Sequence, residues 1–145
     1  MNSKSRSTHG FTLIELMVVV VVVAVLATIA LPSYQQYVRR SERSKAQQIM
    51  LEISNREQQY MLDARAYTAT IGAGGLNIGD KDGWTCTATC SNGKYVVTVT
   101  LAAGPPPTFS ISADPAGTTQ AVDGTLTLSA TGTKTRMVGG TDQGW

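Results

Sequence analysis

A run of apolar residues near the start of the chain constrains the fold more than any other feature. Between Phe11 and Leu31 the only strongly polar side chain is Glu15. As a helix with a rise of about 1.5 Å per residue, these 21 residues reach about 31 Å, enough to cross a hydrocarbon core of about 30 Å. Valine forms helices poorly in water, but in lipid the backbone must satisfy its own hydrogen bonds. We therefore expect a helix that can span a membrane.

The ten residues before this run are polar and basic. They include Lys4 and Arg6 and no acidic side chain, and we regard His9 in the same stretch as incidental. The net charge of the whole chain is only +2, too small to indicate nucleic acid as the main partner. Without residues 1–10 the chain has ten basic and ten acidic side chains. This pattern indicates a leader that orients the chain in a membrane and is then removed.

The residues after Pro32 predict an amphipathic helix. Apolar side chains recur there at steps of three and four residues as far as Tyr67, and no glycine interrupts residues 11–71. The sequence therefore predicts one helix from about Phe11 to about Ala66, with an apolar half (11–32) and an amphipathic half (33–67). Pro32 has no N–H group to donate to the carbonyl of Thr28, so we expect a kink there.

The second half of the chain predicts a small antiparallel sheet. Residues 68–93 form a glycine-rich connection, and strand-like segments follow in residues 94–145, which also include the C-terminal region. The expected strands are Lys94–Ala102, Phe109–Ala113 and Gly124–Thr131. Such a sheet has too small an apolar face to be stable alone, so we expect it to pack on the helix stripe of residues 46–64. The predicted fold class is α+β, with three to four strands.

The start of the chain resembles the type IV pilin family. The resemblance rests on Gly10 followed by Phe11, on Glu15 four residues later, on the apolar stretch, and on Pro32 with Ser33 and Tyr34. It is strong from Ser7 to about Thr68 and weaker beyond. Residues 124–134 are also similar to the last-strand segment of many Gram-negative pilins of the type IVa kind.

The resemblance implies a function in a filament. A prepilin peptidase would cleave between Gly10 and Phe11 at the cytoplasmic face, and Phe11 would become an N-methylated N-terminus. The single-pass precursor would stay in the inner membrane and then, through the assembly machinery, join a homopolymer of pilin subunits outside the cell. Such filaments serve adhesion, twitching motility or DNA uptake. The resemblance implies neither catalysis nor a cofactor. DNA is a possible partner, but no residue supports it.

Glu15 has two interpretations. A carboxylate in a medium of low dielectric constant must be neutralised or paired. The resemblance implies that Glu15 pairs with the Phe11 amine of a neighbouring subunit and so sets the offset between subunits. The residue by itself is also compatible with a glutamate that reaches water between lipid headgroups.

Cys86 and Cys90 are the only cysteines. They are too few for a zinc site of four ligands, and we predict no metal. In an exported domain we expect a disulfide between them. Type IV pilins often have a cysteine-bounded loop near the C-terminus, but Asp123 and Gly144 stand where those cysteines would fall. We therefore expect packing alone to hold the C-terminal region.

Other interpretations of the whole chain remain open. Within the family, the chain is compatible with a major pilin, a minor pilin or a secretion-system pseudopilin. Outside it, the apolar run is compatible with a secretory signal cleaved after Ala27 or Ala30. It is also compatible with an uncleaved anchor for a periplasmic binding module.

Three weaker signals favour structural roles. Asp80, Asp82 and Gly83 resemble the start of a calcium loop, but the later ligands are missing, so a turn is expected. A basic cluster on the helix could touch anionic headgroups or DNA, but the pattern favours a solvated face that is partly paired with Glu42. It comprises Arg39, Arg40, Arg43 and Lys45. Trp84 and Trp145 are expected to be packing anchors.

Overall fold

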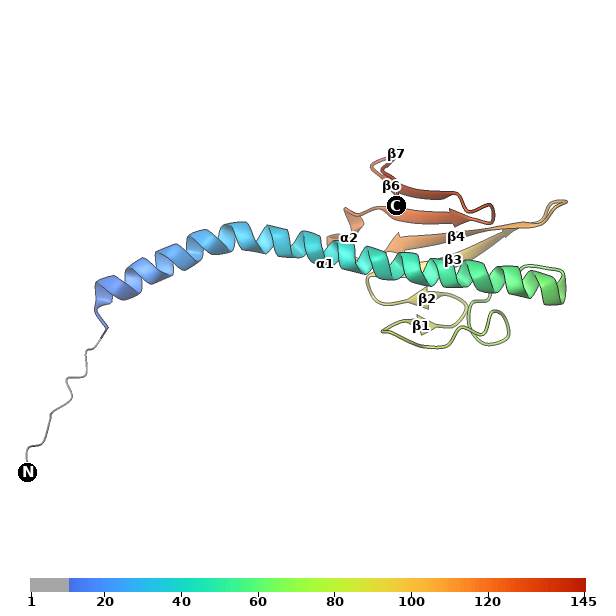
Figure 1. The fold of residues 1–145 in the computed structure, drawn as a ribbon, viewed down its shortest axis with the longest axis horizontal. Coiled ribbons are helices and arrows are strands. Elements are labelled where there is room, and N and C mark those ends of the chain that lie inside the picture. The colour runs from blue at the N-terminus through green and yellow to red at the C-terminus, as the bar shows by residue number, and fades with distance from the viewer. Residues whose placement is uncertain (1–10) are drawn as a thin grey trace, which may run out of the picture. The chain divides into compact units, whose positions relative to one another are not determined.

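The computed structural model describes residues 11–145 (Figure 1). It has two helices and seven strands in the order α1 (Leu13–Ala64), β1 (Thr85–Cys86), β2 (Cys90–Ser91), β3 (Tyr95–Ala102), β4 (Thr108–Pro115), α2 (Thr118–Ala121), β5 (Thr125–Ser129), β6 (Lys134–Val138) and β7 (Thr141–Asp142). The contacts divide the chain into two compact units after Tyr37, and α1 belongs to both.

The long helix confirms the prediction from the sequence. It runs without a break through Pro32 and ends where Arg65 adopts a left-handed conformation, with φ of 55°. A left-handed residue is a common way to close a helix. The kink at Pro32 stays a prediction.

The sheet is a meander in which each strand pairs antiparallel with the next, in the order β1 to β7. The α+β class is confirmed, but the prediction of three to four strands is wrong. β1, β2 and β7 have only two residues each, too short to show an alternating pattern. In β6, Lys134 and Arg136 are the register partners of Leu128 and Leu126 of β5. Because charged residues occupy these positions, the sequence of β6 shows no alternation of apolar and polar residues.

The core lies between α1 and one face of the sheet. Figure 1 shows the second half of α1 crossing the sheet, with β1 and β2 on one side of the helix and β6 and β7 on the other. Alternate residues of β3 as far as Val99, and of β4 and β5, point inward. The main core side chains, each 8% exposed or less, are Ala46, Ile49, Met50, Ile53, Tyr95, Val97, Val99, Phe109, Ile111, Ala113, Leu126 and Leu128.

Candidate functional site

Nearly every residue of the apolar N-terminal half of α1 is exposed. Phe11 is 83% exposed and Leu13 is 76% exposed. The segment is long and apolar enough to cross a membrane, and no part of its most apolar stretch is buried within the protein. The core helix of a soluble domain would be covered, so this segment needs lipid or another protein around it.

The start of α1 has a capping arrangement that we did not predict. The Glu15 N–H donates to the Thr12 hydroxyl, with 3.3 Å between the two atoms, and the hydroxyl donates to the Glu15 carboxylate at 3.4 Å. A Thr-x-x-Glu sequence at a helix start is the pattern of a capping box. Glu15 therefore already has a role within one subunit, and experiments on it must separate capping from pairing.

The predicted processing site is only partly described. Gly10 and the leader of residues 1–10 lie outside the described residues, so the structure does not test cleavage between Gly10 and Phe11. The pairing of Glu15 with a neighbour's Phe11 also stays a prediction.

A disulfide joins Cys86 and Cys90, as expected. It closes the hairpin of β1 and β2, in which the two cysteines are register partners. Cys90 is fully buried and Cys86 is 7% exposed. The loop before β1 packs so closely on this hairpin that a side chain at Gly72 would meet the carbonyl oxygen of Thr87 at 2.7 Å. The disulfide therefore fixes the surface on which the glycine-rich loop lies.

A buried polar cluster forms around Asp123. The Tyr95 hydroxyl donates to the Asp123 carboxylate at 2.7 Å, and the Gln120 amide donates to that hydroxyl at 3.1 Å. Arg43 of α1 lies 3.4 Å from the same carboxylate, and its side chain is only 18% exposed. Burial raises the pKa of the Tyr95 hydroxyl well above its usual value.

The Asp123 cluster corrects our expectation for the basic residues of α1. Lys45 pairs with Glu42 at 2.7 Å, as expected. Arg43, however, is not on a solvated face, because Asp123 arrives from a segment 80 residues later in the chain. The sequence of α1 contains no signal for that partner.

The C-terminal region is not held by packing alone, which also corrects our expectation. Arg136 donates from Nε to the carbonyl oxygen of Gly144 at 2.9 Å and from a terminal nitrogen to the carbonyl oxygen of Asp123 at 3.2 Å. Asp142 accepts from the N–H groups of Arg136 and Gly144, at 2.9 Å each. These two bonds lower the pKa of the Asp142 carboxyl. We call these contacts of Arg136 with Asp123, Asp142 and Gly144 the Arg136 clasp.

Glu57 is a fully buried carboxyl group that the sequence did not single out as part of the core. One of its oxygen atoms accepts from the Thr68 N–H at 3.1 Å, and the other has no hydrogen-bond partner among the described residues. Burial raises the pKa of Glu57, and the bond from Thr68 lowers it by less. Glu57 therefore ties the start of the glycine-rich loop to α1.

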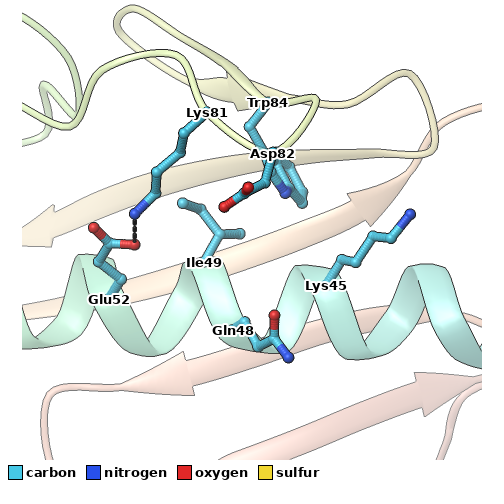
Figure 2. Close-up of a pocket in the computed structure, with 7 residues that line it drawn as sticks. All are labelled: Lys45, Gln48, Ile49, Glu52, Lys81, Asp82 and Trp84. Atoms are coloured by element: carbon cyan, nitrogen blue, oxygen red, sulfur yellow. Dashed lines mark hydrogen bonds and ion pairs between the residues drawn. The ribbon is translucent and has the colours of Figure 1, made fainter.

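A polar hollow of about 300 Å³ lies between α1 and the turn before β1. Figure 2 shows Lys81 reaching from the turn to Glu52, with Ile49 on the helix beside them. The residues that line the hollow are Lys45, Gln48, Ile49, Glu52, Lys81, Asp82 and Trp84. Both lysines are paired with glutamates, so the hollow offers no surplus of positive charge for a phosphate.

The turn at this hollow has the structural role that we expected. Asp82 and Gly83 have φ of 50° and 81°, and the main chains of Lys81 and Trp84 bond to each other across them. Trp84 is 4% exposed in the core, and Trp145 is partly buried against it. Among residues 11–145, no three His, Cys, Asp or Glu side chains gather closely enough to hold a metal ion.

An exposed apolar helix that continues into a helix packed on an antiparallel meander is the architecture expected of a type IV pilin. The family model of the prokaryotic N-terminal methylation motif matches residues 5–31. A second model, described as type IV minor pilin ComP, DNA uptake sequence receptor, matches residues 32–134, more than two thirds of the chain. The chain belongs to this family of type IV minor pilins. No curated protein and no solved structure gave a significant match.

Proposed function

We propose that this chain is a minor subunit of a type IV pilus and that it takes part in DNA uptake. The observation that carries the proposal is the joint match of the two family models over residues 5–31 and 32–134. Together they cover the apolar segment and most of the sheet. The family description favours a minor subunit over the major subunit, a choice that the sequence alone did not decide.

Processing and insertion are the first steps of this function. The methylation-motif match spans Gly10 and Phe11, which supports cleavage between them and methylation of the new amine. Cleavage there leaves the apolar segment on the mature chain. Because no part of its most apolar stretch is buried, the segment supports insertion of the precursor into the inner membrane as a single helix.

Assembly is the second step. In a filament, the exposed apolar segment would be covered by the corresponding helices of neighbouring subunits, and Glu15 would meet a neighbour's Phe11 amine. A minor subunit would make these contacts with the more abundant pilins of the same filament. No catalytic step is needed for this role.

Contact with DNA is the third step. For this step the distribution of charged side chains matters more than the net charge of the chain. Residues 38–145 carry ten basic and nine acidic side chains. Four basic residues, Arg43, Lys45, Lys81 and Arg136, already form ion pairs. The exposed basic residues without an ion pair among residues 38–145 are Arg40, Arg56, Arg65, Lys94 and Lys134. Binding to phosphates through a few such side chains predicts a shallow dependence on salt.

Duplex binding by the mature chain in detergent tests the DNA part of the proposal. We expect measurable binding whose logarithm falls with the logarithm of salt concentration at a slope of about −2 to −4, corresponding to about two to four neutralised phosphates. Deletion of the coding sequence should reduce DNA uptake and leave filaments present. Absence of duplex binding together with normal uptake would contradict the DNA role, and absence of the chain from purified pili would contradict the pilin role.

A further inference from the structure

The basic residues that follow the apolar segment fall into two groups that the sequence does not distinguish. Arg43 and Lys45 are neutralised by Asp123 and Glu42. Arg39 and Arg40 form no ion pair with any residue that the structure describes, and the side chain of Arg40 is exposed. Two adjacent positive charges on this part of α1 are therefore without an ion pair among residues 11–145, with Arg40 exposed and Arg39 partly buried.

An exposed apolar side chain lies beside the same stretch of helix. The Gln120 amide of α2 donates to the main-chain carbonyl of Arg39 at 3.3 Å, and Asp123 pairs with Arg43. The segment between these contacts therefore runs along α1 from Arg39 to Arg43, and Figure 1 shows α2 next to α1 there. Val122 within this segment is 62% exposed. We call Arg39, Arg40 and Val122 the collar patch.

We propose that the collar patch binds the anionic headgroups of the membrane from which α1 emerges. The inference rests on the membrane insertion in the proposed function, and it adds a second contact with the lipid. Arg39 follows Leu31 by eight residues, which is at most about 12 Å along a helix. Side chains on a helix lean toward its N-terminus, so both arginines lean toward the apolar segment.

The chemistry of the patch fits this surface. Interfacial headgroups extend about 5 to 8 Å beyond the hydrocarbon core, within reach of long side chains that lean back from about 12 Å. Basic residues next to a membrane segment attract anionic lipids, and an exposed apolar side chain beside them suits the boundary between headgroups and water. The patch would hold the globular part of the subunit against the membrane before assembly, and entry into a filament would release it.

The test uses the full mature chain in vesicles, with a fluorophore on a cysteine introduced at the exposed position Thr119 of α2 and the disulfide left intact. Quenching by lipids with nitroxide-labelled headgroups measures the contact. We expect stronger quenching in vesicles in which one third of the lipid is phosphatidylglycerol than in vesicles of pure phosphatidylcholine. High salt should remove this difference in quenching. Each substitution, Arg39→Gln and Arg40→Gln, should lower the ratio of contacting to free states about five-fold.

Arg56→Gln provides the matched control. Arg56 is exposed on the same helix and has no ion pair among residues 11–145, but it lies 17 residues beyond Arg39, about 25 Å along the axis. Its substitution should leave quenching unchanged. A folded state for each variant is checked by the resistance of the disulfide to reduction without denaturant.

Three outcomes would overturn the inference. Quenching could be equal in the two lipid mixtures, the arginine variants could behave like the parent, or Arg56→Gln could have the same effect as Arg39→Gln. If the arginine variants keep their lipid contact but lose duplex binding, the patch serves nucleic acid and the membrane inference is wrong. Failure of the parent chain to float with vesicles would instead contradict membrane insertion itself, so the two failures are distinguishable.

Discussion

The guanidinium group of Arg136 donates a hydrogen bond to the main-chain carbonyl oxygen of Gly144, with 2.9 Å between the two atoms. The same group donates to the carbonyl oxygen of Asp123 at 3.2 Å. Asp123 and Gly144 stand where cysteines are expected from the resemblance to other type IV pilins. One arginine therefore joins by hydrogen bonds the two positions that a disulfide would otherwise join. Unlike a disulfide, this connection is insensitive to reductants and sensitive to the loss of one side chain.

Arg136→Ala should loosen the C-terminal region without unfolding the core. Hydrogen bonds from a charged donor contribute more than neutral ones, and the Arg136 side chain is only 18% exposed, so we expect a loss of about 2 kcal/mol in the free energy of unfolding. Hydrogen exchange in β7 and residues 143–145 should rise first. Lys134→Ala is the control, because Lys134 lies on the same strand and its ammonium group lies over the ring of Trp145 at 4.9 Å, with no side-chain hydrogen bond or ion pair among residues 11–145. Equal effects of the two substitutions would contradict the clasp.

Glu57 should make stability depend on pH. Because burial raises its pKa in the folded state above the ordinary value of 4.5, its contribution to stability is fully present below the unfolded pKa. That contribution is lost as the pH rises through the folded pKa. Urea unfolding between pH 4 and pH 8 should show this loss in the parent chain and a flatter profile in Glu57→Gln. Glu52→Gln, which removes a carboxylate that is 31% exposed, is the matched control. Parallel profiles for the parent and Glu57→Gln would show that the buried carboxyl is not responsible.

The disulfide should be closed in the mature protein and should stabilise it. Thiol reagents added to denatured, unreduced protein should label neither Cys86 nor Cys90. Closing so short a loop stabilises the fold by about 2 kcal/mol in the chain-entropy model, so the Cys86→Ser, Cys90→Ser double variant should unfold at lower urea. Full labelling of both thiols would indicate a reducing location and contradict export of this domain.

Much of the fold could be predicted from the sequence because its main signals are periodic. The apolar run and the steps of three and four residues after Pro32 predicted the helix. The strand-like segments Lys94–Ala102, Phe109–Ala113 and Gly124–Thr131 predicted β3, β4 and β5. β6 was missed because its inward positions hold Lys134 and Arg136, which contact Trp145, Gly144 and Asp123 instead of the apolar core. Two-residue strands show no period at all.

The polar contacts could not be predicted because they join distant parts of the chain. No residue near Arg43 in the sequence indicates that Asp123 will neutralise its charge. Likewise, no residue near Glu57 indicates that the Thr68 N–H will donate to its carboxylate. The capping arrangement of Thr12 and Glu15 was within reach, since its spacing of three residues is a known pattern at helix starts. The family motif predicts only the pairing of the Glu15 charge with a neighbouring subunit and does not include its hydrogen bonds with Thr12.

That local role decides how Glu15 should be tested. Glu15→Gln keeps a side chain that can take part in a capping box but removes the charge, whereas Glu15→Val removes both. If Glu15 pairs with a neighbour's Phe11 amine, both variants should be cleaved, stay in the membrane and join pili poorly, because a lost buried pair costs about 3 to 5 kcal/mol. If capping alone matters, Glu15→Gln should join pili as well as the parent. Immunodetection of the variant subunits in sheared pili measures the difference.

Mass spectrometry of the subunit recovered from purified pili tests the central claim most directly. A processed minor pilin should begin at Phe11, carry one methyl group on its amine, and retain the apolar segment of residues 11–31. Replacement of Gly10 by a bulkier residue should leave the uncleaved chain in the membrane and absent from the pili. A subunit that begins at Met1, or at a residue after Ala27, would contradict the account.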